Sequence, residues 1–205
     1  MGTVDSSELQ PWVVPMPQDV SPTHAMRGTV MINERAQLRA AGHFDLYAGR
    51  LSEPDRASLA AVVGQFWVPI DLVHAHFEAV DALNIPDADA YALSRTAGQK
   101  LHNVFVALGA SFLQATGMNP WTAMPVFAKA WDRNFQGGAM GVQQMGPKEA
   151  HIVITSHPLI RHRFHRIGLR AHAAIYIELL ATGADVSELS ADADAGTMTL
   201  AARWT

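Results

Sequence analysis

The spacing of apolar residues changes once along the chain, and the change divides it into two parts. Up to about residue 135, apolar residues recur at steps of three and four, as in Ile70, Val73 and Phe77, which is the period of one helix face. Beyond Gly137-Gly138 the period becomes two, which is typical of strands with one buried side. The pattern therefore predicts helices first and an antiparallel sheet afterwards.

Capping residues and prolines set the expected helix boundaries. Ser52-Glu53-Pro54 and Asn119-Pro120 each place a side-chain oxygen before a proline, and both features favour a helix start. The helices are expected to begin at Asn33, Ser52, Pro69, Asp87, Leu101 and Asn119. Together they form a predicted N-terminal helical layer.

Two hairpins that enclose one long helix are predicted for the last third of the chain. The expected strands cover residues 140–145, 150–157, 185–190 and 197–204, and the helix carries an apolar stripe from Ile160 to Leu179. This order gives an α+β fold, in which a ββαββ unit forms an antiparallel four-stranded sheet with one long helix across it. The N-terminal helices pack around that unit.

The first 26 residues differ in character from the rest. Pro11, Pro15, Pro17 and Pro22 restrict the backbone and remove donors, so this segment is predicted to be an extended arm. The apolar Trp12-Val13-Val14 segment within it is able to dock on the core. Residues 27–205 are expected to form a single domain.

Composition excludes several classes of protein. The formal net charge is −4 and the pI is near 6.2, which argues against non-specific nucleic-acid binding. The absence of cysteine excludes disulfides, thiolate catalysis and cysteine-based metal sites. We see no signal peptide and no apolar run that is long enough to span a membrane, so a cytoplasmic protein is expected. No common catalytic motif is present, which favours a protein that is not an enzyme.

Ten histidines are the most unusual feature of the composition. His74 and His76 lie on opposite sides of a predicted helix, so one metal ion cannot bind both. His151 and His157 lie on one face of a predicted strand, but about 20 Å apart. A hydrogen-bonded role within the sheet is therefore expected for these two.

Three further histidines alternate with arginines near the start of the long helix. His162, His165 and His172 fall near one ridge of that helix. The arginines interleaved with them or next to them include Arg161, Arg163 and Arg166. We expect a solvated polar face here, and the alternative is a site for a carboxylate, a phosphate or a haem propionate.

Aromatic side chains and one isolated histidine supply the other candidates. Trp67, Trp121, Phe127 and Trp131 lie at helical spacing. They are expected in the core, or else they line an apolar pocket between the helices and the sheet. His102 lies on an otherwise apolar predicted helix, where it is either an axial haem ligand or a hydrogen-bonded core residue.

Several short motifs resemble an uncharacterised family expanded in myxobacteria, the Myxococcales paralogous family. These are Trp67-Val68-Pro69-Ile70 before a helix, Trp131 near a helix end, Met145-Gly146-Pro147 in a hairpin, and the closing Trp204. The resemblance covers about residues 27–205. It brings no established activity with it.

The ββαββ ending is similar to a broader group that contains H-NOX haem sensors, 4-vinyl reductase domains and a family of vesicle-tethering subunits. This resemblance implies a ligand held between helices and a sheet. The chain departs from the motifs of this group in two places, and each departure argues against one class of ligand. The Tyr-x-Ser-x-Arg motif of H-NOX proteins has only a differently spaced counterpart in residues 91–95, and the cysteines of 4-vinyl reductase domains are absent.

The sequence thus leads to three functional hypotheses. The first is a non-enzymatic sensory or binding module for a small apolar or amphipathic molecule, with Arg161, Arg163 and Arg166 as anchors for its acidic group. The second is a haem sensor with His102 as its single axial ligand. The third is a homodimeric interaction module that pairs through an edge strand or an exposed helix face.

Overall fold

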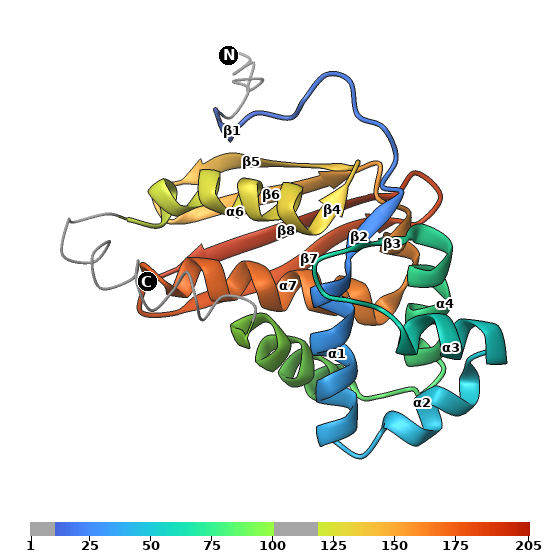
Figure 1. The fold of residues 1–205 in the computed structure, drawn as a ribbon. Coiled ribbons are helices and arrows are strands. Elements are labelled where there is room, and N and C mark those ends of the chain that lie inside the picture. The colour runs from blue at the N-terminus through green and yellow to red at the C-terminus, as the bar shows by residue number, and fades with distance from the viewer. Residues whose placement is uncertain (1–10, 101–118) are drawn as a thin grey trace, which may run out of the picture.

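A five-stranded antiparallel sheet and a cap of helices share one core in the computed structural model, which describes residues 11–100 and 119–205 (Figure 1). Two helices lie side by side on one face of the sheet. A smaller layer of helices packs against the end of that pair. The expected α+β organisation is therefore present, with the helical layer before the ββαββ unit.

The main sheet contains the four expected strands and one more. The four are β5 (Ala139–Gly146), β6 (Glu149–Thr155), β7 (Ala184–Asp192) and β8 (Thr197–Trp204). The strand order is β1-β5-β6-β8-β7. The fifth strand, β1 (Trp12–Val14), comes from the N-terminal arm and pairs antiparallel with β5. The arm thus adds a strand to the four-stranded sheet that the sequence predicts, because the apolar segment of the arm pairs with the edge strand β5.

One face of the sheet is buried and the other is half open. Met198, Leu200, Ala202 and Trp204 of β8 are buried while the residues between them are half-buried or exposed, which is the alternation expected for a sheet covered on one side. In β6 the buried residues include Ile152 and Ile154.

The end of β6 departs from the sequence prediction. The strand ends at Thr155, and Ser156 has a φ of 55°, a left-handed conformation that is uncommon for a residue other than glycine. His157 follows this turn and is fully buried. The prediction that His157 shares a strand face with His151 is therefore wrong, because β6 ends at Thr155 and the left-handed residue Ser156 breaks the alternation before His157.

Two helices cover the buried face. They are α6 (Pro120–Asn134) and α7 (Arg163–Glu178). The side chain of Asn119 accepts a hydrogen bond from the Trp121 N–H at 3.0 Å, which confirms the predicted cap. The expected long helix is divided in two, because a short 3₁₀ helix, η1 (Pro158–Arg161), precedes α7.

A second sheet of three short strands connects the arm to the helical layer. Its strands are β2 (Ala25–Arg27), β3 (Trp67–Pro69) and β4 (Phe135–Gln136), in the order β3-β2-β4. None of these strands was expected, since two or three residues carry no detectable period. Gly137 and Gly138 then turn the chain into β5 with φ values of 82° and 64°. A Cβ at Gly137 would lie 2.4 Å from the Pro22 carbonyl oxygen.

The helical layer is close to the prediction but not identical to it. It consists of α1 (Gly28–Ala40), α2 (Phe44–Arg50), α3 (Glu53–Ala60), α4 (Ile70–Asp81) and a helix over residues 87–100. The Ser52 cap is confirmed by its hydrogen bond from the Asp55 N–H. However, α1 begins at Gly28 and not at Asn33. The Gly28 N–H donates a hydrogen bond to the Phe66 carbonyl, and a partner so distant in sequence cannot be predicted from local signals. The helix expected from residue 101 lies outside the described residues.

None of the helices in the two described ranges is long and apolar enough to cross a membrane.

Candidate functional site

Five histidines gather where the helical layer meets the end of the sheet. His74 and His76 come from α4, His157 from the loop after β6, and His162 and His165 from the start of α7. Four of them, all but His74, are buried. Because a buried polar ring needs hydrogen-bond partners, the bonds between them define what the cluster can do.

The first chain of bonds joins the arm to α7. The Thr23 hydroxyl lies 2.8 Å from Nδ1 of His157, and Nε2 of His157 lies 2.8 Å from Nε2 of His165. Two imidazole nitrogens at this distance share one proton, so one ring donates and the other accepts. Both rings are therefore neutral members of one directed chain.

This chain has two proton arrangements. If His165 donates through Nε2, its Nδ1 carries no hydrogen and His157 donates to the Thr23 oxygen. If His157 donates instead, Nδ1 of His165 carries the hydrogen and the Thr23 hydroxyl donates. The hydroxyl accommodates both arrangements because it can donate or accept. No described residue forms a hydrogen bond with Nδ1 of His165, so this atom distinguishes the two arrangements.

Burial keeps these rings uncharged. It lowers the pKa of His157 to about 3, with a smaller contribution from the charge of His74. Burial also lowers the pKa of His165 well below its usual value, and the neighbouring histidines lower it further. The chain is therefore neutral throughout the physiological range.

A second histidine pair lies at the start of α7. Nδ1 of His74 is 2.7 Å from Nε2 of His162, and burial followed by the charges of His162 and Arg161 lowers the pKa of His74. Asp81, at the end of α4, accepts hydrogen bonds from the backbone N–H groups of Arg163 and Phe164. This carboxylate thus caps α7 from another helix and fixes the position of the rings.

A third group connects α2, α4 and α1. Burial raises the pKa of Tyr47 well above its usual range, so its hydroxyl keeps its proton and donates to Nδ1 of His76 at 2.7 Å. Nε2 of His76 then donates to a carboxylate oxygen of Glu34 at 3.0 Å. The hydrogen bond holds the Glu34 carboxylate, which lines the cavity described next.

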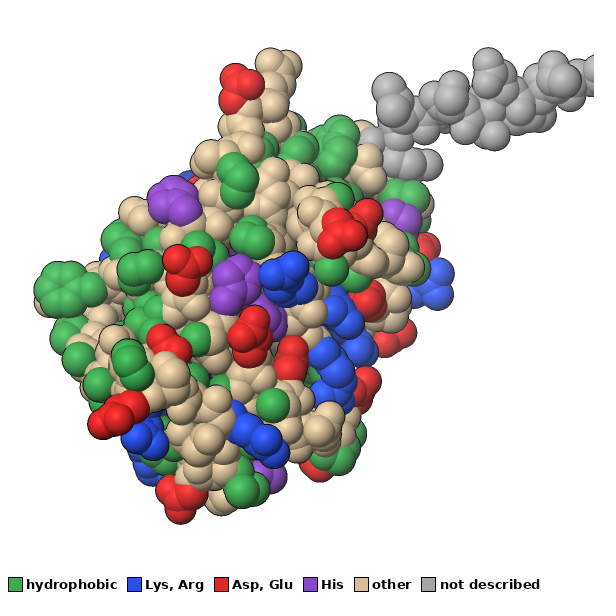
Figure 2. All heavy atoms as spheres, turned by 90° about the vertical axis from the view of Figure 1, so that its right-hand side faces the viewer, with side chains coloured by type: hydrophobic (Ala, Val, Ile, Leu, Met, Phe, Trp, Pro, Cys, Tyr) green, Lys and Arg blue, Asp and Glu red, His purple; other side chains and the backbone are tan. Residues whose placement is uncertain are grey.

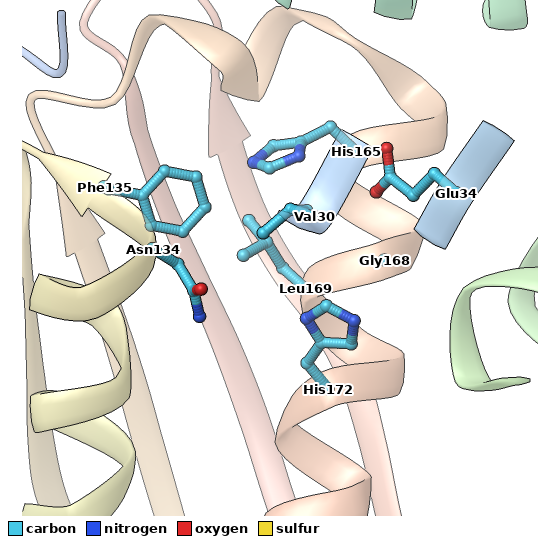
Figure 3. Close-up of a pocket in the computed structure, with 8 residues that line it drawn as sticks. All are labelled: Val30, Glu34, Asn134, Phe135, His165, Gly168, Leu169 and His172. Atoms are coloured by element: carbon cyan, nitrogen blue, oxygen red, sulfur yellow. The ribbon is translucent and has the colours of Figure 1, made fainter. Parts of the chain in front are cut away.

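A small cavity separates α1 from α7 and β4. Its volume is about 20 Å³, which is enough for one water molecule. Figure 3 shows His165, Leu169 and His172 projecting from α7 toward Phe135 and Asn134 on the opposite side. The remaining lining residues are Val30, Glu34 and Gly168. The cavity therefore offers a carboxylate, two imidazoles and an amide to a small guest.

The geometry suits hydrogen bonding better than metal binding. Within residues 11–100 and 119–205, no group of three or more histidine, aspartate or glutamate side chains is arranged to hold a metal ion. The histidine nitrogens instead pair with one another at 2.7 to 2.8 Å.

The three arginines singled out from the sequence do not act as one group. Arg163 pairs with Asp87, and Arg166 pairs with Glu188 at 3.2 Å. Arg161 is exposed and forms no ion pair within the described residues. Figure 2 shows acidic and basic side chains interspersed on the face at the right of Figure 1. Their role as ligand anchors stays a prediction.

The four aromatic candidates lie in different places. Trp67 stacks under the guanidinium of Arg27, 3.7 Å from the ring centre. Trp121 packs edge-on against the closing Trp204 and donates to the Pro147 carbonyl. The other two are buried on α6: Phe127 contacts Tyr176, and Trp131 contacts Phe135 and His157. These last two thus belong to the core, and the binding role of all four residues stays a prediction.

A second expectation about the histidines, that of a solvated face on α7, is wrong. His162 and His165 do not lie on a solvated face, since each is at most 5% exposed. The start of α7 packs against α4, where the rings of His162 and His165 contact Phe77, while the arginines beside them stay partly exposed. His102, the predicted axial ligand, lies outside the described residues.

Comparison with solved structures identifies the architecture. The chain is similar to an Fe(II) unliganded H-NOX protein from K. algicida, with 11% identity over 88% of this chain and 97% of that one, at a TM-score of 0.61. It is also similar to an oxygen-binding H-NOX domain related to soluble guanylate cyclases, with 13% identity over 88% and 95% of the two chains and a TM-score of 0.56.

The chain has the H-NOX fold. A structure from work on haem distortion in the H-NOX family matches as well, with 14% identity, 88% and 95% coverage and a TM-score of 0.53. At these identities the likeness concerns the fold alone. No family model matches the sequence, and no curated protein matches it either, so the myxobacterial resemblance remains a prediction while the broader H-NOX-like group is supported.

Proposed function

We propose that this chain is a non-enzymatic sensor domain of the H-NOX fold that binds a small hydrogen-bonding ligand in the cavity beside His165. The observation that carries the proposal is the Thr23–His157–His165 chain, which ends at a ring that lines the cavity. A ligand that donates a hydrogen bond to Nδ1 of His165 stabilises one proton arrangement. A ligand that accepts one stabilises the other.

The size and chemistry of the cavity define the ligand class. A volume of about 20 Å³ admits a guest of one or two heavy atoms. Glu34 is an acceptor, and His165 is an acceptor or a donor according to its tautomer. The larger apolar or amphipathic ligand expected from the sequence does not fit this space as it stands.

The proposal predicts that donor and acceptor probes select opposite tautomers of His165. With ¹⁵N-histidine-labelled protein, two-bond ¹H–¹⁵N spectra distinguish the protonated ring nitrogen. Ammonium, a donor, is expected to favour the Nε2–H tautomer, whereas cyanide, an acceptor, is expected to favour Nδ1–H.

A filled cavity supplies the control for this experiment. Leu169→Phe places a larger ring in the cavity, at a destabilisation of about 1–3 kcal/mol, and should make the tautomer insensitive to both probes. The same tautomer with both probes, or an unchanged response in Leu169→Phe, would contradict the proposal.

Haem is the second candidate ligand, because one matching structure comes from work on haem distortion. The imidazoles of the site have the right chemistry for an axial ligand. However, a pocket for a molecule of this size needs about 300 Å³ or more, and the cavity offers about 20 Å³. This cavity therefore does not hold haem as it stands, and in the haem hypothesis the axial ligand is His102, as the sequence predicts.

An absorption spectrum distinguishes the two candidates. If the chain is a haem sensor, protein from cells given a haem precursor will show a Soret band that shifts on reduction. His102→Ala should remove the band, and His151→Ala, a half-buried control in β6, should retain it. Colourless protein would eliminate haem and leave the haem-independent sensor.

A further inference from the structure

A second, larger cavity opens at the surface beside the loop that carries His157. It lies between the arm, η1 and the β7–β8 turn, and its volume is about 410 Å³, which is within the range of small-molecule sites. Its lining includes Pro22, Ser156, Pro158, Arg161, Asp194 and Gly196. None of these residues lines the inner cavity.

Two opposite charges line this groove without meeting. The Arg161 guanidinium forms no hydrogen bond or ion pair with any described side chain, whereas Arg163 and Arg166 are both paired. The Asp194 carboxylate is also unpaired within the described residues, since only its backbone N–H is bonded, to Asp192. Each charge is therefore available to a ligand that fits between them.

Backbone hydrogen bonds hold the walls of the groove together. The Thr23 N–H donates to the Ser156 carbonyl at 2.8 Å, and the His157 N–H donates to the Gly196 carbonyl at 2.9 Å. Gly196 has a φ of 61°, and a Cβ there would lie 2.9 Å from the His157 nitrogen. The arm, the loop and the turn thus form a preorganised frame, which reduces the entropy lost on binding.

We propose that this groove binds a small zwitterion, namely a free α-amino acid. The guanidinium of Arg161 takes the ligand carboxylate through paired hydrogen bonds, and the Asp194 carboxylate takes the ammonium group. Pro22 and Pro158 supply an apolar surface for the ligand side chain. This site is separate from the cavity at His165, so the proposal holds or fails independently of the sensor proposal.

Isothermal titration calorimetry of the full chain with the twenty free amino acids tests the proposal. At least one is expected to bind. Its des-amino and decarboxylated analogues should bind about tenfold more weakly or worse, because each lacks one charge-assisted contact. Arg161→Gln and Asp194→Asn should each weaken binding of the intact amino acid to a similar extent.

Matched controls keep the result specific. Arg56→Gln on α3 and Asp89→Asn on the helix of residues 87–100 remove exposed charges far from the groove in sequence, and both should bind like the unmodified chain. All four altered side chains are exposed, so circular dichroism should show an unchanged fold. Three outcomes would overturn the proposal: no binding by any amino acid, full binding in either groove variant, or equally tight binding of either the des-amino or the decarboxylated analogue.

Discussion

Phe77→Ala is expected to lower the free energy of unfolding by about 3–5 kcal/mol, the range for truncation of a fully buried phenylalanine. Phe77 is 0% exposed and lies among the histidines of the site. Its ring centre is 4.9 Å from that of His76, 4.8 Å from that of His165 and 5.8 Å from that of His162. Removing the phenyl ring therefore leaves a void beside the three histidine rings that it holds in position. Urea denaturation measures the loss.

Phe66→Ala provides the comparison, because Phe66 is 61% exposed and its truncation should change stability by no more than about 0.5 kcal/mol. Equal effects of the two substitutions would show that the histidine cluster is not packed around Phe77 as described.

Acid should destabilise the protein more steeply than its carboxylates alone would require. The pKa of His157 is about 3 in the folded chain, against an ordinary value of 6.5, and that of His165 is also lowered. Protons therefore bind preferentially to the unfolded chain between these two values. As pH falls from about 6.5 toward 3, His157 should reduce stability by about 1.4 kcal/mol per pH unit. The lowered pKa of His165 should add a loss of stability in the same direction.

The contribution of His157 can be isolated by substitution. His157→Gln keeps a side-chain hydrogen-bonding group but does not titrate, so stability should fall less steeply with acid by about 1.4 kcal/mol per pH unit. Denaturation curves recorded from about pH 7 to about pH 4 supply the two slopes. Parallel slopes would mean that His157 is protonated in the folded protein and that the neutral chain described here is wrong.

Local signals in the sequence were sufficient for the parts of the fold that depend on neighbouring residues. The caps at Ser52 and Asn119 and the alternation of β8 follow from such signals. The three short strands of the second sheet do not, because their partners are distant: Met26 pairs with Val68 and Phe135. The start of α1 at Gly28 has the same cause.

The candidate site was harder to predict, because its residues come from separate elements. His157 and His165 are eight positions apart, but they meet only because Ser156 ends the regular strand and η1 offsets the start of α7. Thr23, which completes the chain, is contributed by the arm. Histidines interleaved with arginines indicate a solvated face when α7 is considered alone. The second layer of helices makes that face an interior one.

The pairing of β1 with β5 has a consequence for the order of events during synthesis. Trp12 leaves the ribosome well before its partner Gln143, which lies 131 positions later in the chain. Thr23 likewise waits for His157. Contacts of such long sequence separation form slowly, so the arm should be the last segment to join. Until the arm pairs with it, β5 has an unpaired edge that can bind other nascent chains. The risk of misassembly is therefore greatest before the arm joins the sheet.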